Sequence, residues 1–312
     1  MTAGQHRIES LKQGARRQEC CVHIQSVDAL ELSILLNRLA CERLDRKARD
    51  IMRTLRACDD SWNECFHTML LSVLGGMDNR APMLRLAERV TSNMLMRENS
   101  SIVKLEALLL GGAGLLEIYG DDDYLRLLRE EFHHLAAKYG IVPMMAGEWQ
   151  LTGLYPHNHP TLRLTQLAAC FHNRDFTLQS ALECRTSSAV YNFFGGETSD
   201  YWLTNFIPAS SHSVTSYRMG HLKSDLLGLN LIAPMMHAYS AYTRNSNTSN
   251  DAIHLLESIA AESNKFTKPW SMAGLTLHNA FESQALIQLS KEYCSRLQCE
   301  RCPLARCLLN GI

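Results

Sequence analysis

Long hydrophobic runs are missing from this 312-residue chain, and their absence excludes the common helical kinds of membrane protein. No apolar segment reaches the roughly 18 residues that a membrane-spanning helix needs. The N-terminal region begins with MTAGQHRIESLKQGARRQE, which lacks the apolar centre of a secretory signal peptide. We therefore expect a cytoplasmic protein that does not enter a membrane.

An excess of charge of one sign is also missing, because 31 Lys and Arg residues face 32 Asp and Glu residues. A strongly basic nucleic-acid-binding protein is therefore excluded, and any contact with DNA or RNA has to use a local site. The sequence also lacks a glycine-rich phosphate loop, a dinucleotide-binding glycine pattern, His-Glu-x-x-His and Gly-x-Ser-x-Gly. These absences leave enzymatic activity open and favour a non-enzymatic role for this chain alone.

Alternation of apolar and polar residues, the mark of β-strands, is never sustained, whereas helical spacing recurs along the chain. Helices are predicted from Val27 to Leu55, over Ile102–Leu110 as a central buried helix, and over His221–Tyr242 with a kink at Pro234. The acidic run Asp121-Asp122-Asp123 is expected to cap a helix rather than bind a metal. The expected fold is all-α, a multi-helix globular domain with a short Cys-rich C-terminal loop.

Three parts of the chain are expected from these patterns. Residues 1–20 are predicted to be a mobile polar arm, and residues 21–293 a helical domain, either single or formed by two closely packed subdomains. Residues 294–312 are predicted to be a Cys-rich tail of metal-binding character. Within the helical domain, the polar segment Thr243–Asn250 is predicted to be an exposed loop.

Eleven cysteines are present, but their odd number and irregular spacing in a long chain argue against a secreted disulfide scaffold. Single cysteines in helical stretches are expected to be buried, inert thiols. This expectation applies to Cys41, Cys58, Cys65, Cys170 and Cys184. The adjacent Cys20 and Cys21 are assigned no role.

The tail carries the strongest chemical signal, four cysteines separated by gaps of four, two and four residues. The predicted metal ligands are Cys294, Cys299, Cys302 and Cys307. Four thiolates in one short loop suit a [4Fe–4S] cluster, and they also suit one tetrahedral zinc ion. A tail without metal is the remaining alternative. In either metal-bound form, we expect the metal to hold this end of the chain together rather than to react.

A second candidate site lies at the predicted helix that begins at Pro160. His157 and His159 precede this helix, while Arg163 and Gln166 share a neighbouring face of it. The N-terminus of a helix attracts anions, and the guanidinium group of Arg163 would strengthen that attraction. These four residues are therefore candidate ligand-binding residues. The structural alternative is a capped helix start with Arg163 paired to an acid.

Five stretches of the sequence carry a resemblance to a known family: VKLEALLLGGAGLLE, DDDYLRLLREEFHHLAAKYGIVPM, YPHNHPTLRLTQLAA, LLGLNLIAPMMHAYSAY and AFESQALIQLSKEYCSRLQCERC. In this order, the stretches resemble the bacterial family known as domain of unknown function 2851. The resemblance implies no established activity. Members are usually longer, with a β-rich, nuclease-like N-terminal part that we do not expect in this chain. The resemblance includes the cysteines at Cys294, Cys299 and Cys302.

These observations favour a helical accessory module, stabilised by iron–sulfur or zinc, that acts in nucleic-acid processing through a local site for DNA or RNA. A metal-free scaffold that docks another protein through its apolar helices is the alternative. A hydrolase with its site at His157, His159 and Arg163 is the third hypothesis.

Overall fold

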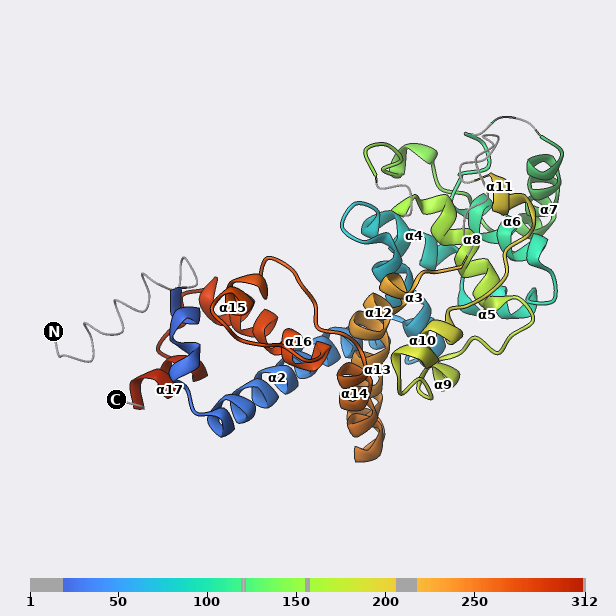
Figure 1. Ribbon diagram of the computed structural model, residues 1–312. Coiled ribbons are helices and arrows are strands. Elements are labelled where there is room, and N and C mark those ends of the chain that lie inside the picture. The colour runs from blue at the N-terminus through green and yellow to red at the C-terminus, as the bar shows by residue number, and fades with distance from the viewer. Residues whose placement is uncertain (1–18, 119, 121, 155–157, 206–217, 311–312) are drawn as a thin grey trace. The chain divides into compact units, whose positions relative to one another are not determined.

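The computed structural model describes residues 19–118, 120, 122–154, 158–205 and 218–310 of the chain (Figure 1). These residues are predominantly helical and contain no β-strand, which confirms the predicted all-α fold for the described ranges. The predicted polar arm lies outside them except for its last two residues. No helix in these ranges is both long and apolar enough to cross a bilayer.

The chain separates into two compact units that are not consecutive in sequence. Unit 1 comprises residues 1–49 and 237–312, and unit 2 comprises residues 50–236. Unit 2 is therefore inserted, in sequence order, between the two segments of unit 1. The boundaries fall within two helices, α2 (Ala29–Ala57) and α13 (Ala233–Thr243).

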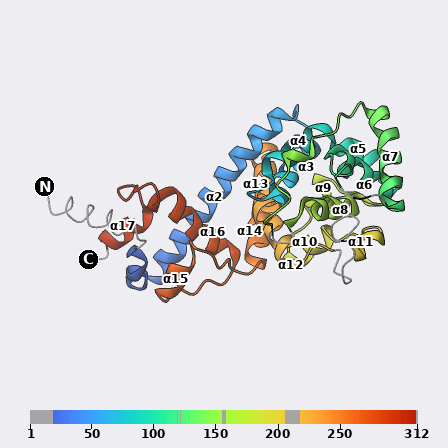
Figure 2. The ribbon, with the colours of Figure 1, turned by 90° about the horizontal axis from the view of Figure 1, so that it is seen from above.

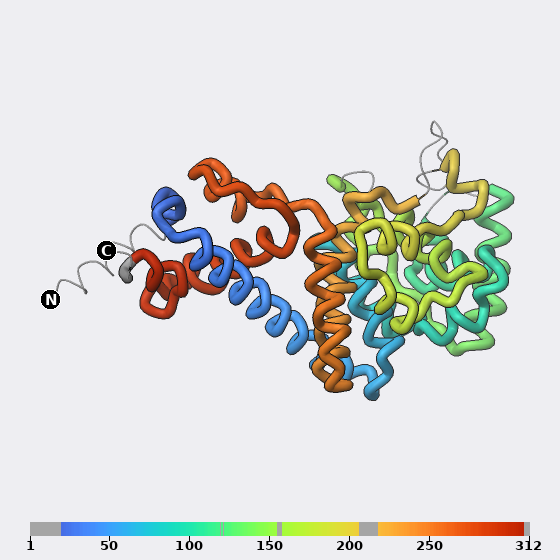
Figure 3. Tube along the Cα trace, turned by 60° about the horizontal axis from the view of Figure 1, so that its bottom comes forward, coloured from blue at the N-terminus to red at the C-terminus, as the bar shows by residue number. Residues whose placement is uncertain are grey.

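Unit 1 is assembled from both of its sequence segments. The N-terminal segment supplies the 3₁₀ helix η1 (Glu19–Ser26) and the first part of α2. After α13, the C-terminal segment supplies α14 (Ser246–Ser258), α15 (Lys268–Met272), α16 (Ala280–Gln288), the π-helical η5 (Leu289–Cys294) and α17 (Pro303–Asn310). Helices α13 and α14 run side by side (Figure 3), joined by a hydrogen bond of 3.0 Å between His237 and Ser249.

Helix α2 joins the two segments of unit 1 because it packs beside α16 (Figure 2). The side-chain oxygen of Gln284 on α16 accepts hydrogen bonds from Arg43 and Lys47 on α2. Leu39 of α2 and Trp270 of α15 are fully buried in the core of this unit. Burial of such large apolar side chains is the main favourable contribution to folding. η1 contacts α15, so this short N-terminal helix is fixed by the C-terminal segment.

Unit 2 is built around α6, which is buried from Leu105 to its end at Gly112, as predicted from its apolar sequence. Helices α7 and α8 pack against it, while α3 packs against α4. In chain order, the elements are α3 (Trp62–Gly75), α4 (Arg80–Arg89), α5 (Ser92–Arg97), α6 (Ile102–Gly112), α7 (Asp123–Tyr139), η2 (Ala146–Glu148), α8 (Pro160–Phe171), α9 (Leu178–Ala181), α10 (Ser187–Phe193), α11 (Tyr201–Thr204), α12 (His221–Leu227) and the π-helical η4 (Gly228–Ile232).

Helix starts in unit 2 follow the local sequence closely. Ser61, Thr91 and Ser101 each accept a hydrogen bond from a backbone N–H of the first turn of the following helix. Asp122 does the same for α7, since its Oδ1 accepts from the N–H of Leu125 at 2.8 Å. The capping role predicted for the acidic run is therefore confirmed for Asp122, while Asp121 lies outside the described residues.

One local expectation gains detail from the structure, and another is wrong. The helix from His221 onward departs from α geometry before Pro234, in the π-helical η4. Proline has no N–H to donate to the carbonyl four residues earlier, and a π-helical turn accommodates this missing bond. The segment Thr243–Asn250 was expected to be a loop, but α14 begins at Ser246. The side chain of Asn245 caps this helix by accepting a hydrogen bond from the N–H of Asn247.

Candidate functional site

Four cysteines line one small hollow in unit 1, and one of them comes from the opposite end of the sequence. Cys294 ends η5, Cys299 and Cys302 lie in the turn that follows, and Cys20 lies in η1. The remaining lining residues are Tyr293, Leu304 and Ala305. Three of the four predicted tail ligands thus surround one space, and Cys20 completes a set of four thiols.

The tail adopts this shape for local reasons. η5 widens the last turn of the helix and ends it at Cys294. The N–H of Cys302 then donates to the carbonyl of Cys299 at 3.2 Å, which closes a tight turn. Pro303 opens α17 at a position where a helix needs no backbone donor. The sequence thus determines the curvature that turns these three sulfurs toward the same side.

The thiols of this hollow are electrostatically coupled. Burial, with the neighbouring Cys302, Cys20 and Cys299, raises the pKa of Cys294 to about 12. Burial, together with Cys299 and Cys302, raises the pKa of Cys20 to about 11. Burial also raises the pKa of Cys302, although N–H groups of Ala305 and Leu304 oppose the rise. Without a cation, the thiols of Cys20, Cys294 and Cys302 are therefore protonated at neutral pH and poor nucleophiles.

Cys307 does not line the hollow. It lies on α17 and is half-buried, and Glu31 is the nearby charge that, after burial, raises its pKa. Cys20 was not assigned a role from the sequence, because it is separated from the tail by nearly the whole chain. Its neighbour Cys21 gives no sign of a link to the tail. Only the packing of η1 on the C-terminal segment brings Cys20 to the tail cysteines.

Across the described part of the chain, no group of three or more His, Cys, Asp or Glu side chains is arranged to hold a metal ion. A zinc ion needs all its sulfur ligands at about 2.3 Å from one centre. A four-iron cluster instead takes each thiolate at a different iron, which allows a wider ring of sulfurs.

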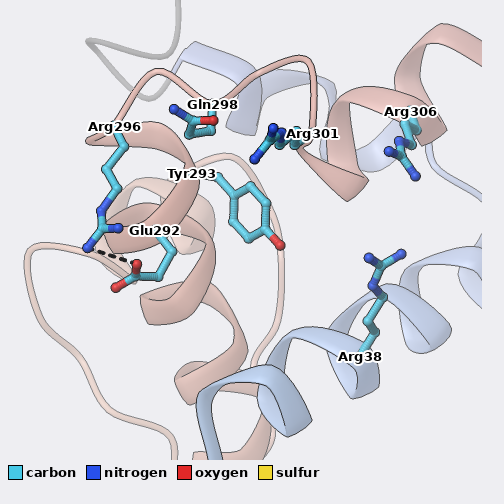
Figure 4. A pocket seen from close by; sticks show the side chains of 7 residues that line it. All are labelled: Arg38, Glu292, Tyr293, Arg296, Gln298, Arg301 and Arg306. Carbon is cyan, nitrogen blue, oxygen red and sulfur yellow. Dashed lines mark ion pairs between the residues drawn. The ribbon is translucent and has the colours of Figure 1, made fainter. Parts of the chain in front are cut away.

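A basic pocket adjoins the cysteine hollow, and Tyr293 lines both. The pocket has a volume of about 680 Å³. Its other lining residues are Arg38, Glu292, Arg296, Gln298, Arg301 and Arg306. Figure 4 shows Arg38 on α2 and Arg306 on α17 extending toward one another. The tail therefore brings three arginines next to a fourth from α2.

Two of these four arginines are paired with acids and two are not. Arg296 forms an ion pair with Glu292 at 3.0 Å (Figure 4), and Arg38 forms one with Glu42 at 3.0 Å. Arg301 and Arg306 are exposed and form no ion pair with any described residue. Tyr293 donates a hydrogen bond of 2.8 Å to Glu42, which ties the tail to α2.

The second predicted site lies in unit 2, at the start of α8. His157 lies outside the described residues, while His159, Arg163 and Gln166 are all buried. Arg163 donates to the side-chain oxygen of Gln166 at 2.8 Å and to that of Asn158 at 3.4 Å. No described acid pairs with Arg163, so the structural alternative of an acid-paired arginine does not apply to these residues.

Arg163 also lines a cavity of about 430 Å³ that the sequence did not predict. Lys223 of α12 lines the same cavity, as do Gly75 at the end of α3 and Gly76 after it. Burial and the charge of Arg163 lower the pKa of Lys223 to about 8. No sequence signal links Lys223 to Arg163, because helix packing alone brings them together. His159 does not line this cavity, and burial lowers its pKa.

Comparison with known proteins identifies the family. No curated protein and no solved structure matches this chain. The family described as "Protein of unknown function (DUF2851)" matches residues 2–265. This match includes four of the five stretches on which the resemblance was based and ends before the fifth, which contains the tail cysteines. Since the match extends over most of the sequence, the chain belongs to the DUF2851 family.

Proposed function

We propose that this protein is a metal-stabilised accessory module that contacts nucleic acid through the basic pocket of unit 1. In this proposal, Cys20, Cys294, Cys299 and Cys302 hold a [4Fe–4S] cluster or, failing that, a zinc ion. The observation that carries the proposal is the arrangement of Cys20 with the three tail cysteines around one hollow. Such a protein would keep its thiols reduced in the cytoplasm.

The residues around the hollow fit a buried thiolate-bound metal. Cys294, Cys299 and Cys302 are 7–8% exposed. The pKa values of Cys20, Cys294 and Cys302 are all raised, mainly by burial. A cationic metal would replace the thiol protons and remove the cost of burying thiolates. The metal would fix the tail rather than perform chemistry, because the hollow that the sulfurs line is only about 20 Å³ in volume and leaves no room for a substrate.

The basic pocket supplies the nucleic-acid part of the proposal. Phosphate contacts by arginine dominate the affinity of proteins for DNA and RNA. Arg301 and Arg306 are available for such contacts, and Arg301 lies between two proposed ligands, Cys299 and Cys302. Because the metal would fix this turn, it would also fix the position of Arg301. The cysteines and the arginines would thus form one functional surface.

The ligand set is tested by metal analysis of protein purified without oxygen. The wild-type protein is expected to contain about four irons, or one zinc, per chain, with visible absorbance around 400 nm in the iron case. Cys20→Ser is expected to lose most of this metal. The matched control Cys307→Ser, which changes a thiol outside the hollow, is expected to retain it. Metal-free wild-type protein, or equal metal in both variants, would contradict the proposed site.

Nucleic-acid binding is tested by measuring the affinity for single- and double-stranded oligonucleotides at several salt concentrations. Neutralising two phosphate contacts with Arg301→Ala and Arg306→Ala should weaken binding and reduce the salt slope by about 2. Arg49→Ala removes a charge from the exposed surface of α2 outside the pocket and serves as the control. Unchanged affinity in the double variant rules out this pocket as the contact surface.

Two other functions stay as alternative proposals with distinct outcomes. A metal-free scaffold would form a stable complex with a partner protein, and chelators would not affect that complex. A hydrolase with its site at His157, His159 and Arg163 would lose activity in Arg163→Ala. Retention of a measured hydrolytic activity in that variant would reject this corner as the catalytic site.

A further inference from the structure

Two cations of unit 2 line one cavity, and neither forms an ion pair with an acid among the described residues. Arg163 of α8 and Lys223 of α12 both line the cavity of about 430 Å³ described above. Asp78 lines it as well, yet no ion pair joins this acid to either cation in the described residues. The two positive groups repel one another, since the charge of Arg163 lowers the pKa of Lys223. Such an arrangement costs free energy unless an anion occupies the space between them.

The hydrogen bonds of both side chains leave donors available. Arg163 is 5% exposed, and its Nε is a buried donor without a partner. Lys223 donates to the carbonyl of Val73 at 3.2 Å, and an ammonium group carries three protons. The carbonyl of Val73 and the side-chain oxygen of Asn158 are uncharged acceptors. They therefore position the two cations without neutralising their charge. A buried guanidinium donor without a partner is available to a ligand that enters the cavity.

Apolar side chains complete the cavity at its mouth. Met77 is 97% exposed, Leu222 is 84% exposed and Leu226 is 41% exposed, although all three line this cavity. Leu74, in contrast, is buried within α3 and forms part of the wall. A ligand with a charged end and an apolar body would cover the exposed apolar surface while its charged end reaches the cations. The volume lies in the usual range for small-molecule sites.

We propose that this cavity binds a phosphate monoester of a small molecule with an apolar or aromatic body, held by Arg163 and Lys223. A phosphate monoester offers three terminal acceptor oxygens to the donors of Arg163 and Lys223, whereas a carboxylate offers only two. Arginine and lysine together are a common pair for phosphate, one offering planar donors and the other a point charge. This inference concerns binding only and is independent of the metal and of the basic pocket in unit 1.

The test uses isothermal titration of the full chain with phenyl phosphate, inorganic phosphate and benzoate at one ionic strength. Phenyl phosphate is expected to bind most tightly, because it adds the apolar contact to the charge contact. A phosphorylated oligonucleotide forms a further arm that distinguishes a strand end from a free small molecule. Tighter binding of the oligonucleotide than of phenyl phosphate, or tightest binding of benzoate, would overturn the proposal.

Variants assign any binding to the cavity. Lys223→Gln is expected to weaken the binding of phenyl phosphate by at least about tenfold, which is the usual loss for one charged hydrogen bond. Arg126→Gln removes a positive charge from the exposed face of α7 in the same unit and should leave the affinity unchanged. Leu222→Glu places a negative charge at the mouth on an exposed side chain, so it tests the site without disturbing the core. Absence of binding by the wild-type chain, or unchanged affinity in both Lys223→Gln and Leu222→Glu, would overturn the inference.

Discussion

Glu98, at the end of α5, shows how a single carboxylate in this protein is held in its charged form. It is 5% exposed and accepts hydrogen bonds from Lys138 and Tyr139, with Lys104 at 3.4 Å. Burial alone would raise its pKa, but the hydrogen bonds and charges of these neighbours lower the pKa to about 2. This carboxylate therefore connects α5, α6 and α7 through its charge rather than through its size.

Replacement of Glu98 by Gln is expected to destabilise the protein in a pH-dependent way. A depressed pKa stabilises the folded state above the ordinary carboxyl pKa, and that contribution is lost as pH falls toward 2. At pH 7, the free energy of unfolding should fall by on the order of 2 to 3 kcal/mol. Urea unfolding of both proteins between pH 7 and pH 2 measures this difference, which should shrink steadily below about pH 4.5. The control variant Glu88→Gln changes an exposed carboxylate. Its stability difference from the wild-type protein should not shrink in this way as pH falls.

The cysteines show the limit of prediction at the residue scale. The spacing of the tail indicated Cys294, Cys299 and Cys302, because residues close in sequence are necessarily close in space. Cys20 carries no local sign of its position, since only the contact of η1 with α15 brings it to the tail. Lys223 is a similar case, because its neighbour Arg163 lies on a separate helix. Sequence therefore identifies chemical groups more reliably than it identifies their partners.

At the scale of elements, two glycines end helices with different backbone conformations. Gly140 follows α7 with φ 68° and ψ 32°, the left-handed helical conformation. Gly76 follows α3 with φ 63° and ψ −138°, a conformation essentially restricted to glycine. A Cβ atom at either position would meet nothing within 4 Å, so space is not limiting in either case. Substitutions at these two positions therefore test the cost of backbone conformation without a contribution from steric overlap.

We predict that Gly140→Asn costs little, whereas Gly76→Asn costs about 1 to 3 kcal/mol of stability. Asparagine adopts the left-handed helical conformation readily, but it does not readily adopt the one found at Gly76. Thermal unfolding of the two variants beside the wild-type protein provides the comparison. Equal losses of stability at the two positions would show that the ψ difference has no energetic effect.

The helices themselves were largely predictable, and the reasons are local. Ser61 and Gly76 delimit α3 because a side-chain cap and a glycine turn are properties of single residues. The turn at Asn245 was missed because a run of polar residues indicates a loop, while a single capping side chain already begins α14. The π-helical η4 was predicted only as a kink at Pro234, since sequence does not specify how a helix absorbs a missing bond. The division into units depends on long-range contacts and had no local signal.

At the scale of the whole molecule, all four proposed metal ligands belong to unit 1. A metal that binds only the folded state stabilises the unit that contains it, and the other unit gains nothing directly. The stability of the two units should therefore respond differently to the loss of metal. Such a difference is measurable because amide exchange reports local opening along the chain.

We predict that Cys299→Ser with Cys302→Ser accelerates amide hydrogen exchange in η1 and α16, while α6 and α8 keep their protection. On the proposed function, the variant loses the metal that would link the two segments of unit 1, so these segments open more often. Hydrogen exchange followed by mass spectrometry gives the rates for each segment. Cys58→Ser, a change within unit 2, is the control. Uniform acceleration over both units would contradict a metal effect confined to unit 1.

The separation of Cys20 from the tail has a consequence for how the protein is made on the ribosome. Cys20 is synthesised early, whereas Cys302 follows roughly 280 residues later, or about 15 to 55 seconds at ordinary translation rates. During that interval, unit 2 can fold as soon as its own segment is complete, but unit 1 has to wait for its second segment. A chain that stops early would never assemble the four thiols. Only chains that were translated through to the tail would then be able to bind the proposed metal.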